Sequence, residues 1–205
     1  MISTNILNFL VYQKNIFSFE VSTHFDNNEN EIIEPILGMK FGMKLSTTFV
    51  SNLIMMLTSI HSLTRWAVLF FGLWTLFNAV RGVVSKKGYD KPDNLSNLFF
   101  MISCDIQLLI GIIIYVSNGW FEKLTGGMGP VMKDTYSRFF AVEHAFTMIL
   151  AWILVHVGRT AVKKASSHKK HKAMLLYFGL ALLLILISIP WPFRDVIGKA
   201  LFPSF

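Results

Sequence analysis

Charged residues are scarce in this chain of 205 residues, and cysteine is almost absent. Asp, Glu, Lys and Arg together make up 15% of the sequence, against about 25% in an ordinary soluble domain. Cys104 is the single cysteine, so the chain forms no intramolecular disulfide and contains neither a CxxC redox motif nor a CxxCH haem-attachment motif. The sequence also has no nucleophile paired with a base, no phosphate-binding loop and no zinc-ligand spacing. These absences argue against hydrolases, nucleotide-binding enzymes and structural zinc proteins.

In place of charge, the chain has apolar sequence gathered into long blocks. Apolar residues account for 53% and aromatic residues for 14% of the chain, and the mean hydropathy is +0.52. Blocks of about 20 apolar residues predict membrane-spanning helices. We expect these helices at about residues 62–84, 95–116, 139–162 and 173–189. The sequence therefore predicts an all-α integral membrane four-helix bundle with up-down topology.

The positive charges predict how the bundle is oriented. The net charge is +7, but the basic residues lie between apolar blocks and no recognition motif accompanies them, so we expect no nucleic-acid partner. Basic residues follow the first block in Lys86–Lys91 and the third block in Arg159–Lys172. The positive-inside rule places both loops in the cytoplasm. The loop 117–138 and both termini are then expected to be extracytoplasmic, with the lipid bilayer as the main surroundings.

Residues 1–55 differ in composition from the rest, and two interpretations remain open. This stretch is rich in Asn, Glu, Ile and Phe, and it includes an acidic cluster at residues 27–34. It is either a weakly structured extracytoplasmic extension or a stretch upstream of the natural start, and we favour the second because Met43 and Met56 each resemble a start. Residues 43–60 fit an outward extension of the first helix. The four-helix domain is expected at residues 56–205, with a short interfacial amphipathic helix at 193–205.

Polar residues near the outer ends of the first and third blocks predict a cofactor site. A helix rises about 1.5 Å per residue, which puts Arg65 at the same depth as Glu143 and His144. We expect an Arg65–Glu143 ion pair with His61 and His144 beside it. Two neutral imidazoles on adjacent helices can ligate the iron of a haem b from both sides. The alternative is a polar cluster that only stabilises helix packing.

A second polar layer is expected deeper in the bilayer, formed by Asp105, Gln107 and His156. The estimated depths of Asp105 and His156 differ by about 5 Å, which predicts a contact between them. This layer would serve a proton relay or a quinone head group, or would act only as a hydrogen-bonded clasp, which we favour. His144 and His156 are about 18 Å apart along one helix and cannot share an iron. The run 168–171, with a histidine at each end, is interpreted as a basic, solvated loop.

The sequence from about residue 56 to 202 resembles a family of small bacterial four-helix inner-membrane proteins, often labelled cytochrome b-like. The matching segments are Leu57–Trp66, Gln107–Gly111 with Tyr115, Arg138–His144, Gly158-Arg159 and Ile189–Arg194. The resemblance implies a multi-pass protein of the bacterial inner membrane, and its cytochrome label depends on the histidines. Members of the family can carry histidine two positions before the glutamine, where this chain has Asp105. His156 then lacks an axial partner, which argues for one haem at most.

Three functions are compatible with these features. A b-type cytochrome-like protein would pass electrons between a quinol and a redox partner, and would have His61 and His144 facing each other across an apolar slot. A non-redox structural or assembly protein would be tightly packed there, with Arg65 bonded to Glu143. A small proton or solute carrier using Asp105 is less favoured, because the chain has no internal repeat or broken helix. Since so short a bundle exposes much surface to lipid, other membrane subunits are further candidate partners.

Overall fold

The computed structural model describes residues 47–202. The described residues up to Asn52 belong to one unit, and those from Leu53 onwards belong to a second unit. In the first unit only the beginning of helix α2 belongs to the described residues. The expectations for residues 1–46 therefore lie outside them, as does the end of the chain after residue 202. The second unit holds all the features discussed below.

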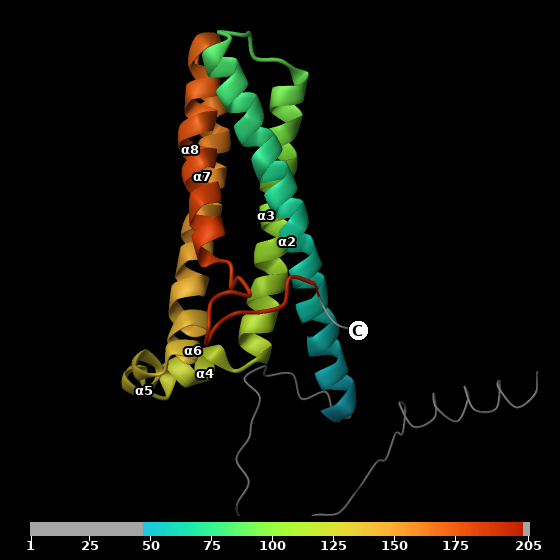
Figure 1. Ribbon diagram of the computed structural model, residues 1–205, viewed down its shortest axis with the longest axis vertical. Helices are drawn as coiled ribbons and strands as arrows, with labels where there is room; N and C mark the ends of the chain where they lie inside the picture. Colours follow the sequence, from blue (N-terminus) through green and yellow to red (C-terminus); the bar gives the residue numbers. More distant parts are fainter. Residues whose placement is uncertain (1–46, 203–205) are drawn as a thin grey trace, which may run out of the picture. The chain divides into compact units, whose positions relative to one another are not determined.

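The described residues form helices joined by turns, with no strand among them (Figure 1). The long helices are α2 (Thr47–Val84), α3 (Lys91–Ser117), α7 (His144–Lys164) and α8 (Ser167–Ser188). Between α3 and α7 lie α4 (Trp120–Thr125), α5 (Met128–Lys133), α6 (Thr135–Arg138) and the π-helix η1 (Phe139–Glu143). Four stretches, Phe49–Val84, Lys91–Ser117, Thr135–Lys164 and Lys169–Ser188, are long and apolar enough to cross a membrane. The expected all-α class is confirmed for the described residues, as is the presence among them of four helices long and apolar enough to span a membrane.

Helix boundaries differ from the expected ones where no breaking residue intervenes. α2 begins at Thr47, so the described part of the outward extension expected at residues 43–60 is helical and continues into the block expected from residue 62, because neither proline nor glycine interrupts the chain between Thr47 and Leu69. α8 begins at Ser167, so residues 168–171 are helical and the expected solvated loop is wrong. The loop 117–138 contains three short helices rather than a simple turn.

A capping box fixes the beginning of α3. The Asp90 carboxylate accepts from the Asp93 N–H at 3.2 Å, and the Asp93 carboxylate accepts from the Asp90 N–H at 3.0 Å. Lys87 Nζ lies 2.5 Å from Asp90 Oδ2, and this neighbour lowers the pKa of Asp90 from 3.8 to about 2. Because the folded-state pKa is the lower one, this contribution to stability is present at neutral pH and is lost as the pH falls towards 2.

Hydrogen bonds join the long helices to their neighbours near both ends of the bundle. Asn78, near the end of α2, donates to Ser96 Oγ near the beginning of α3 at 3.2 Å. At the opposite end, the Tyr115 hydroxyl of α3 donates to the Ala141 carbonyl in η1 at 2.8 Å. His144 at the beginning of α7 then lies 2.9 Å from the carbonyl of Ser188 at the end of α8.

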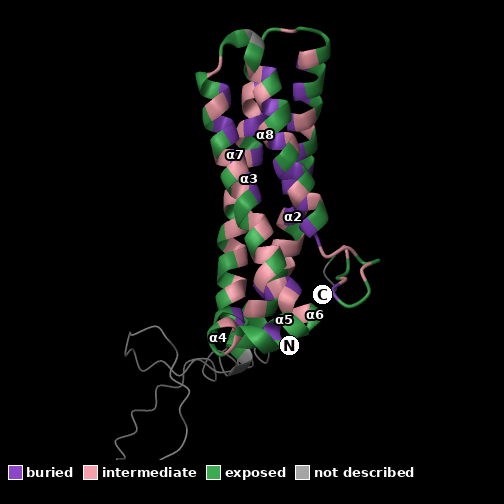
Figure 2. Ribbon diagram, turned by 90° about the vertical axis from the view of Figure 1, so that its left-hand side faces the viewer, coloured by how far each residue is buried: buried purple, intermediate pink, exposed green. Residues whose placement is uncertain are grey.

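Buried residues occur in both halves of the bundle and are more numerous in one of them. Figure 2 shows the buried residues mainly in the half where α3 and α8 begin, which we call the tight half. The buried residues of α3 all fall between Asp93 and Cys104, and those of α7 all fall from Ala151 onwards. Phe100, with 0% exposure, belongs to the tight half. The half that contains His61 and His144 has a smaller buried cluster of its own, formed by Trp120, Val131 and Ala141.

The C-terminal segment, residues 190–202, returns from α8 to α2 as a series of turns (Figure 1). The interfacial helix expected from residue 193 is wrong for the described residues. Pro190 and Pro192 have no N–H to donate, so a helix does not continue through them. Lys199 N–H donates to the Pro190 carbonyl at 3.0 Å, which closes one of the turns. The Arg194 guanidinium donates to the Ile187 carbonyl at 3.1 Å, which ties the segment to the end of α8.

Candidate functional site

Polar side chains gather in three clusters along the second unit. We name each after one residue. The His61 cluster comprises His61, Thr64, Arg65, Gln107 and His144; the Asp105 cluster comprises Asp105, Trp152 and His156; the Asp93 cluster comprises Asp93, Asn94, Asn97, Arg159 and His171.

Gln107 belongs to the His61 cluster and not to the deeper layer in which the sequence had placed it. Its Nε2 donates to the His61 carbonyl at 3.0 Å, and its Oε1 accepts from the Thr64 hydroxyl. Residues two positions apart on a helix point about 200° away from each other. Asp105 and Gln107 therefore face different neighbours although they have nearly the same depth.

The imidazole of His61 lies in a space that Gly111 provides. A Cβ atom added at Gly111 would lie 3.2 Å from His61 Cε1, tighter than ordinary van der Waals contact. His61 Nδ1 is buried and has no hydrogen-bond partner among the described residues. Its electrostatic neighbours are His144 and Arg65. An unpaired polar atom in such a position is uncommon, because burial without a partner costs about 1–3 kcal/mol.

His144 is held in one orientation by the end of α8. Its Nδ1 donates to the Ser188 carbonyl at 2.9 Å, and the Ser188 hydroxyl lies 3.3 Å away. This hydrogen bond puts the proton of a neutral imidazole on Nδ1 and leaves the Nε2 lone pair available. η1 directly precedes His144, and π-helical turns are frequent at functional sites.

The expected Arg65–Glu143 ion pair is wrong. Glu143 is instead paired with Arg138, whose Nε lies 2.9 Å from its Oε1. Adjacent helical residues point about 100° apart, so Glu143 faces outward when His144 faces α8. Arg65 donates to the Leu201 carbonyl at 2.7 Å, and its buried Nε has no partner among the described residues. Arg65 is 8% exposed and forms no ion pair within residues 47–202.

The C-terminal segment covers the His61 cluster on the α2 side. Trp66 Nε1 donates to the Leu201 carbonyl at 3.3 Å, and the Trp66 ring stacks on Phe202 with centroids 5.4 Å apart. The sequence analysis missed this arrangement, since nothing in a local pattern relates Leu201 to α2.

The Asp105 cluster brings together the two residues whose contact the sequence predicts, and adds a third. Asp105 Oδ1 accepts from His156 Nε2 at 2.8 Å and from Trp152 Nε1 at 2.7 Å. The indole and imidazole rings lie 4.4 Å apart between centroids. The side chains of Asp105 and His156 are 40% and 36% exposed, so this cluster lies at the surface of the bundle rather than in its centre.

The Asp93 cluster was not expected as a site and is the most deeply buried of the three. His171 Nε2 lies 3.0 Å from Asp93 Oδ2, and these side chains are 3% and 2% exposed. Gly82 of α2 makes room for the pair, because a Cβ there would overlap the His171 ring. The capping position of Asp93 could have been read from the sequence, but its pairing with a residue 78 positions away could not.

Arg159 connects α7 to the beginning of α3 in the same cluster. Its guanidinium donates to the Asn94 side chain at 2.8 Å and to the Asn97 side chain. Asn97 also donates to the Tyr89 hydroxyl at 3.0 Å, and burial raises the pKa of Tyr89. The cluster thus joins three helices through hydrogen bonds at the end where the basic loops lie.

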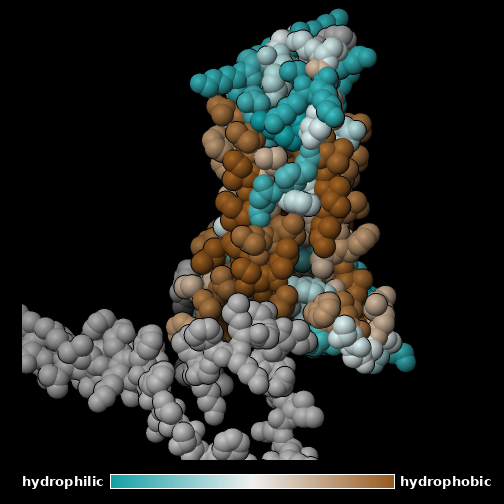
Figure 3. Space-filling view, turned by 180° about the vertical axis from the view of Figure 1, so that it is seen from behind, coloured by the Kyte–Doolittle hydropathy of each residue, from teal (hydrophilic) through white to brown (hydrophobic). Residues whose placement is uncertain are grey.

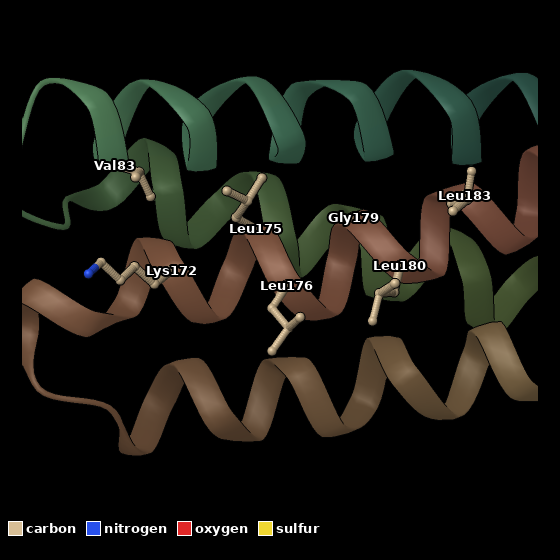
Figure 4. Close-up of a pocket in the computed structure, with 7 residues that line it drawn as sticks. All are labelled: Val83, Lys172, Leu175, Leu176, Gly179, Leu180 and Leu183. Atoms are coloured by element: carbon tan, nitrogen blue, oxygen red, sulfur yellow. The ribbon is translucent and has the colours of Figure 1, made fainter.

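The described residues contain no group of three or more His, Cys, Asp or Glu side chains able to hold a bare metal ion. Haem brings its own nitrogen ligands and needs only axial ligands from the protein. His61 and His144 are residues of the type that can supply them. Figure 4 shows a groove on α8 lined almost wholly by aliphatic side chains, with Lys172 at one end. Such a lining suits lipid tails and offers no ligand to a metal. No protein-family model, curated protein or solved structure matches this chain.

Proposed function

We propose that this protein is a membrane b-type cytochrome-like protein that holds one haem b between His61 and His144 and passes electrons between a quinol and a redox partner. The observation that carries the proposal is the buried Nδ1 of His61, which has no hydrogen-bond partner among the described residues. His144 faces the same region with one ring nitrogen held by Ser188 and the other available.

The residues present suit a haem in two respects: their imidazoles can ligate iron, and the positive charge of Arg65 can pair with a haem carboxylate. Imidazole ligates through either ring nitrogen, and the Ser188 carbonyl supplies the outer hydrogen bond that orients a ligating histidine. Arg65 offers a buried Nε and an unneutralised charge, suited to a haem carboxylate. When bound, the haem would supply a one-electron redox centre. Trp66 and the C-terminal segment would exclude water from it.

A visible spectrum tests the haem proposal. Protein purified after expression with ample haem is expected to show a Soret band and, after dithionite reduction, an alpha band. His144→Ala is expected to abolish both bands, because one axial ligand is lost. His168→Ala, at the beginning of α8, serves as the matched histidine control and should leave them unchanged.

Three results would contradict the proposal. The first is wild-type protein that folds but shows neither band. The second is His144→Gly protein whose bands persist. The third is His144→Gly protein whose lost bands do not return when free imidazole is added. Imidazole rescue separates the loss of a ligand from a general loss of folding.

The same proposal includes an orientation in a bacterial inner membrane. The basic residues of Lys86–Lys91 and Lys163–Lys172 lie at the Asp93 end, and the positive-inside rule would make this end cytoplasmic. The His61 cluster and the two ends of the described chain would then be extracytoplasmic.

Cysteine labelling in intact bacterial cells tests this orientation. In a Cys104→Ser background, an impermeant maleimide is expected to label Lys123→Cys and to leave Lys164→Cys unlabelled until the cells are lysed. Both positions are exposed, so accessibility within the protein is matched. The reverse labelling pattern would rule the orientation out.

A non-redox structural role is the second candidate, favoured by the Asp93 cluster. There the buried polar groups are largely satisfied by one another across three helices, as expected of residues that stabilise helix packing. That role offers no partner for the buried Nδ1 of His61. We therefore place it second.

A further inference from the structure

The Asp105 cluster lies in an unusual place for ionisable residues in a membrane protein. Asp105 is near the middle of α3, and its carboxylate and the His156 imidazole are 40% and 36% exposed at the α3–α7 surface. Around them, Ile102, Ile106 and Ile153 are each more than 40% exposed and suited to lipid. Ionisable groups within a membrane usually face a bundle interior or a water-filled cavity. Here they open towards the hydrocarbon.

The cluster retains hydrogen-bonding capacity on its open side. Asp105 Oδ1 is saturated by the indole and imidazole N–H groups. Within residues 47–202, neither Asp105 Oδ2 nor His156 Nδ1 has a hydrogen-bond partner. One acceptor oxygen and one imidazole nitrogen are therefore free next to an aromatic pair whose centroids are 4.4 Å apart. In hydrocarbon, each unsatisfied group costs several kcal/mol.

We propose that Asp105, Trp152 and His156 form a lateral binding site for the head group of a membrane-soluble quinol. One quinol hydroxyl would donate to Asp105 Oδ2, and the other would donate to His156 Nδ1, because Nε2 of this imidazole already donates to Asp105 Oδ1. The Trp152 indole supplies an aromatic surface for the ring. A ligand of this class dissolves in the bilayer and reaches the site sideways between lipids, which is the side on which the cluster is open.

Figure 3 shows hydrophilic side chains within the hydrophobic belt on the face drawn. A second copy of the chain is the less suitable occupant. A two-fold contact centred on this surface would bring one Asp105 carboxylate towards the other, and like charges in a low-dielectric setting repel strongly. A neutral aromatic ring with two oxygens satisfies the free atoms without that cost.

The inference extends the proposed function, since a haem protein of this kind needs a quinol site, but the binding itself requires no haem. Failure of one therefore leaves the other testable. Saturable quinol binding to protein that shows no haem bands would contradict the haem proposal but not this inference. Haem bands in protein that binds no quinol would contradict this inference but not the haem proposal.

The test uses the full chain in quinone-free lipid nanodiscs and an azido-substituted ubiquinol, kept reduced, as a photolabel. Peptide mapping is expected to find the label next to Asp105 on α3 or Trp152 on α7, and excess decylubiquinol should compete it away. Asp105→Asn should lower labelling by roughly tenfold, as expected for a lost hydrogen bond involving a charged group. Trp152→Phe should also lower labelling, because it removes the indole N–H that positions the Asp105 carboxylate. Glu143→Gln, a carboxylate paired elsewhere, is the matched control and should label like wild type.

Three outcomes would overturn the inference. The first is label spread over the lipid-facing surface of all the spanning helices and not reduced by competitor. The second is specific labelling that Trp152→Phe and Asp105→Asn leave unchanged. The third is a stable dimer that Asp105→Asn dissociates while no labelling occurs at the cluster, which would identify a second copy as the occupant.

Discussion

Asp93→Ala is expected to destabilise the folded protein by about 1.5–3 kcal/mol, the usual contribution of a hydrogen bond that involves a charged group. The carboxylate is 2% exposed and lies 3.0 Å from His171 Nε2, whose own side chain is 3% exposed. Its loss leaves the imidazole without its carboxylate partner in the tight half of the bundle. The same substitution removes the Asp93 half of the capping box at the beginning of α3.

Unfolding of the purified protein by SDS in mixed micelles, followed by circular dichroism, measures this effect. Glu122→Ala on the exposed surface of α4 is the control and should change stability by less than about 0.5 kcal/mol. A double-mutant cycle with Asp93→Asn and His171→Gln should give a coupling energy within about 0.5–3 kcal/mol. A loss below about 1 kcal/mol for Asp93→Ala would show that the pair contributes little.

The sequence predicts the long helices well because block length and hydropathy are local properties. The expected block at 95–116 corresponds to α3, Lys91–Ser117, and that at 139–162 falls within Phe139–Lys164. Capping residues such as Asp90 also act locally and can be recognised in advance. Where boundaries moved, as for α2, the chain simply contained no residue that stops a helix.

The candidate sites were less predictable because depth along a helix does not give direction around it. Arg65 and Glu143 share a depth but do not meet, since Glu143 points away from the face that His144 uses. Asp105 and His156 share a depth and also a face, so they do meet. A correct prediction needed the rotation of each helix, which tertiary packing determines.

Long-range contacts were beyond sequence reasoning for a related reason. The carbonyl that Arg65 binds is 136 residues away in the C-terminal segment. His171 stands in a run of lysines that indicates solvent, yet the absence of a side chain at Gly82 allows its ring to be buried. Gly82 provides this space because it has no side chain, and a hydropathy pattern does not reveal such a space.

The same property of glycine leads to the second large expected effect, at the contact between α7 and α8. A Cβ atom at Gly158 would lie 2.6 Å from Tyr177 Cβ. Tyr177 Cβ is fixed to the α8 backbone, so rotating a side chain cannot relieve the overlap and the helices must separate. Small residues at helix contacts contribute close packing, a main source of helix association in a bilayer. Gly158→Ala is therefore expected to destabilise the protein by about 1–3 kcal/mol, the usual cost of overpacking.

Gly179→Ala on α8 provides the matched control for Gly158→Ala. Its nearest contact would be Leu76 Cδ1 at 3.7 Å, an ordinary van der Waals distance, and alanine favours a helix over glycine by about 1 kcal/mol. This variant should be neutral or stabilising in the same SDS titration. Because both substitutions add one methyl group to a spanning helix, propensity and hydrophobicity change alike, and only the space differs. Equal stability of the two variants would mean that α7 and α8 do not depend on close approach at Gly158.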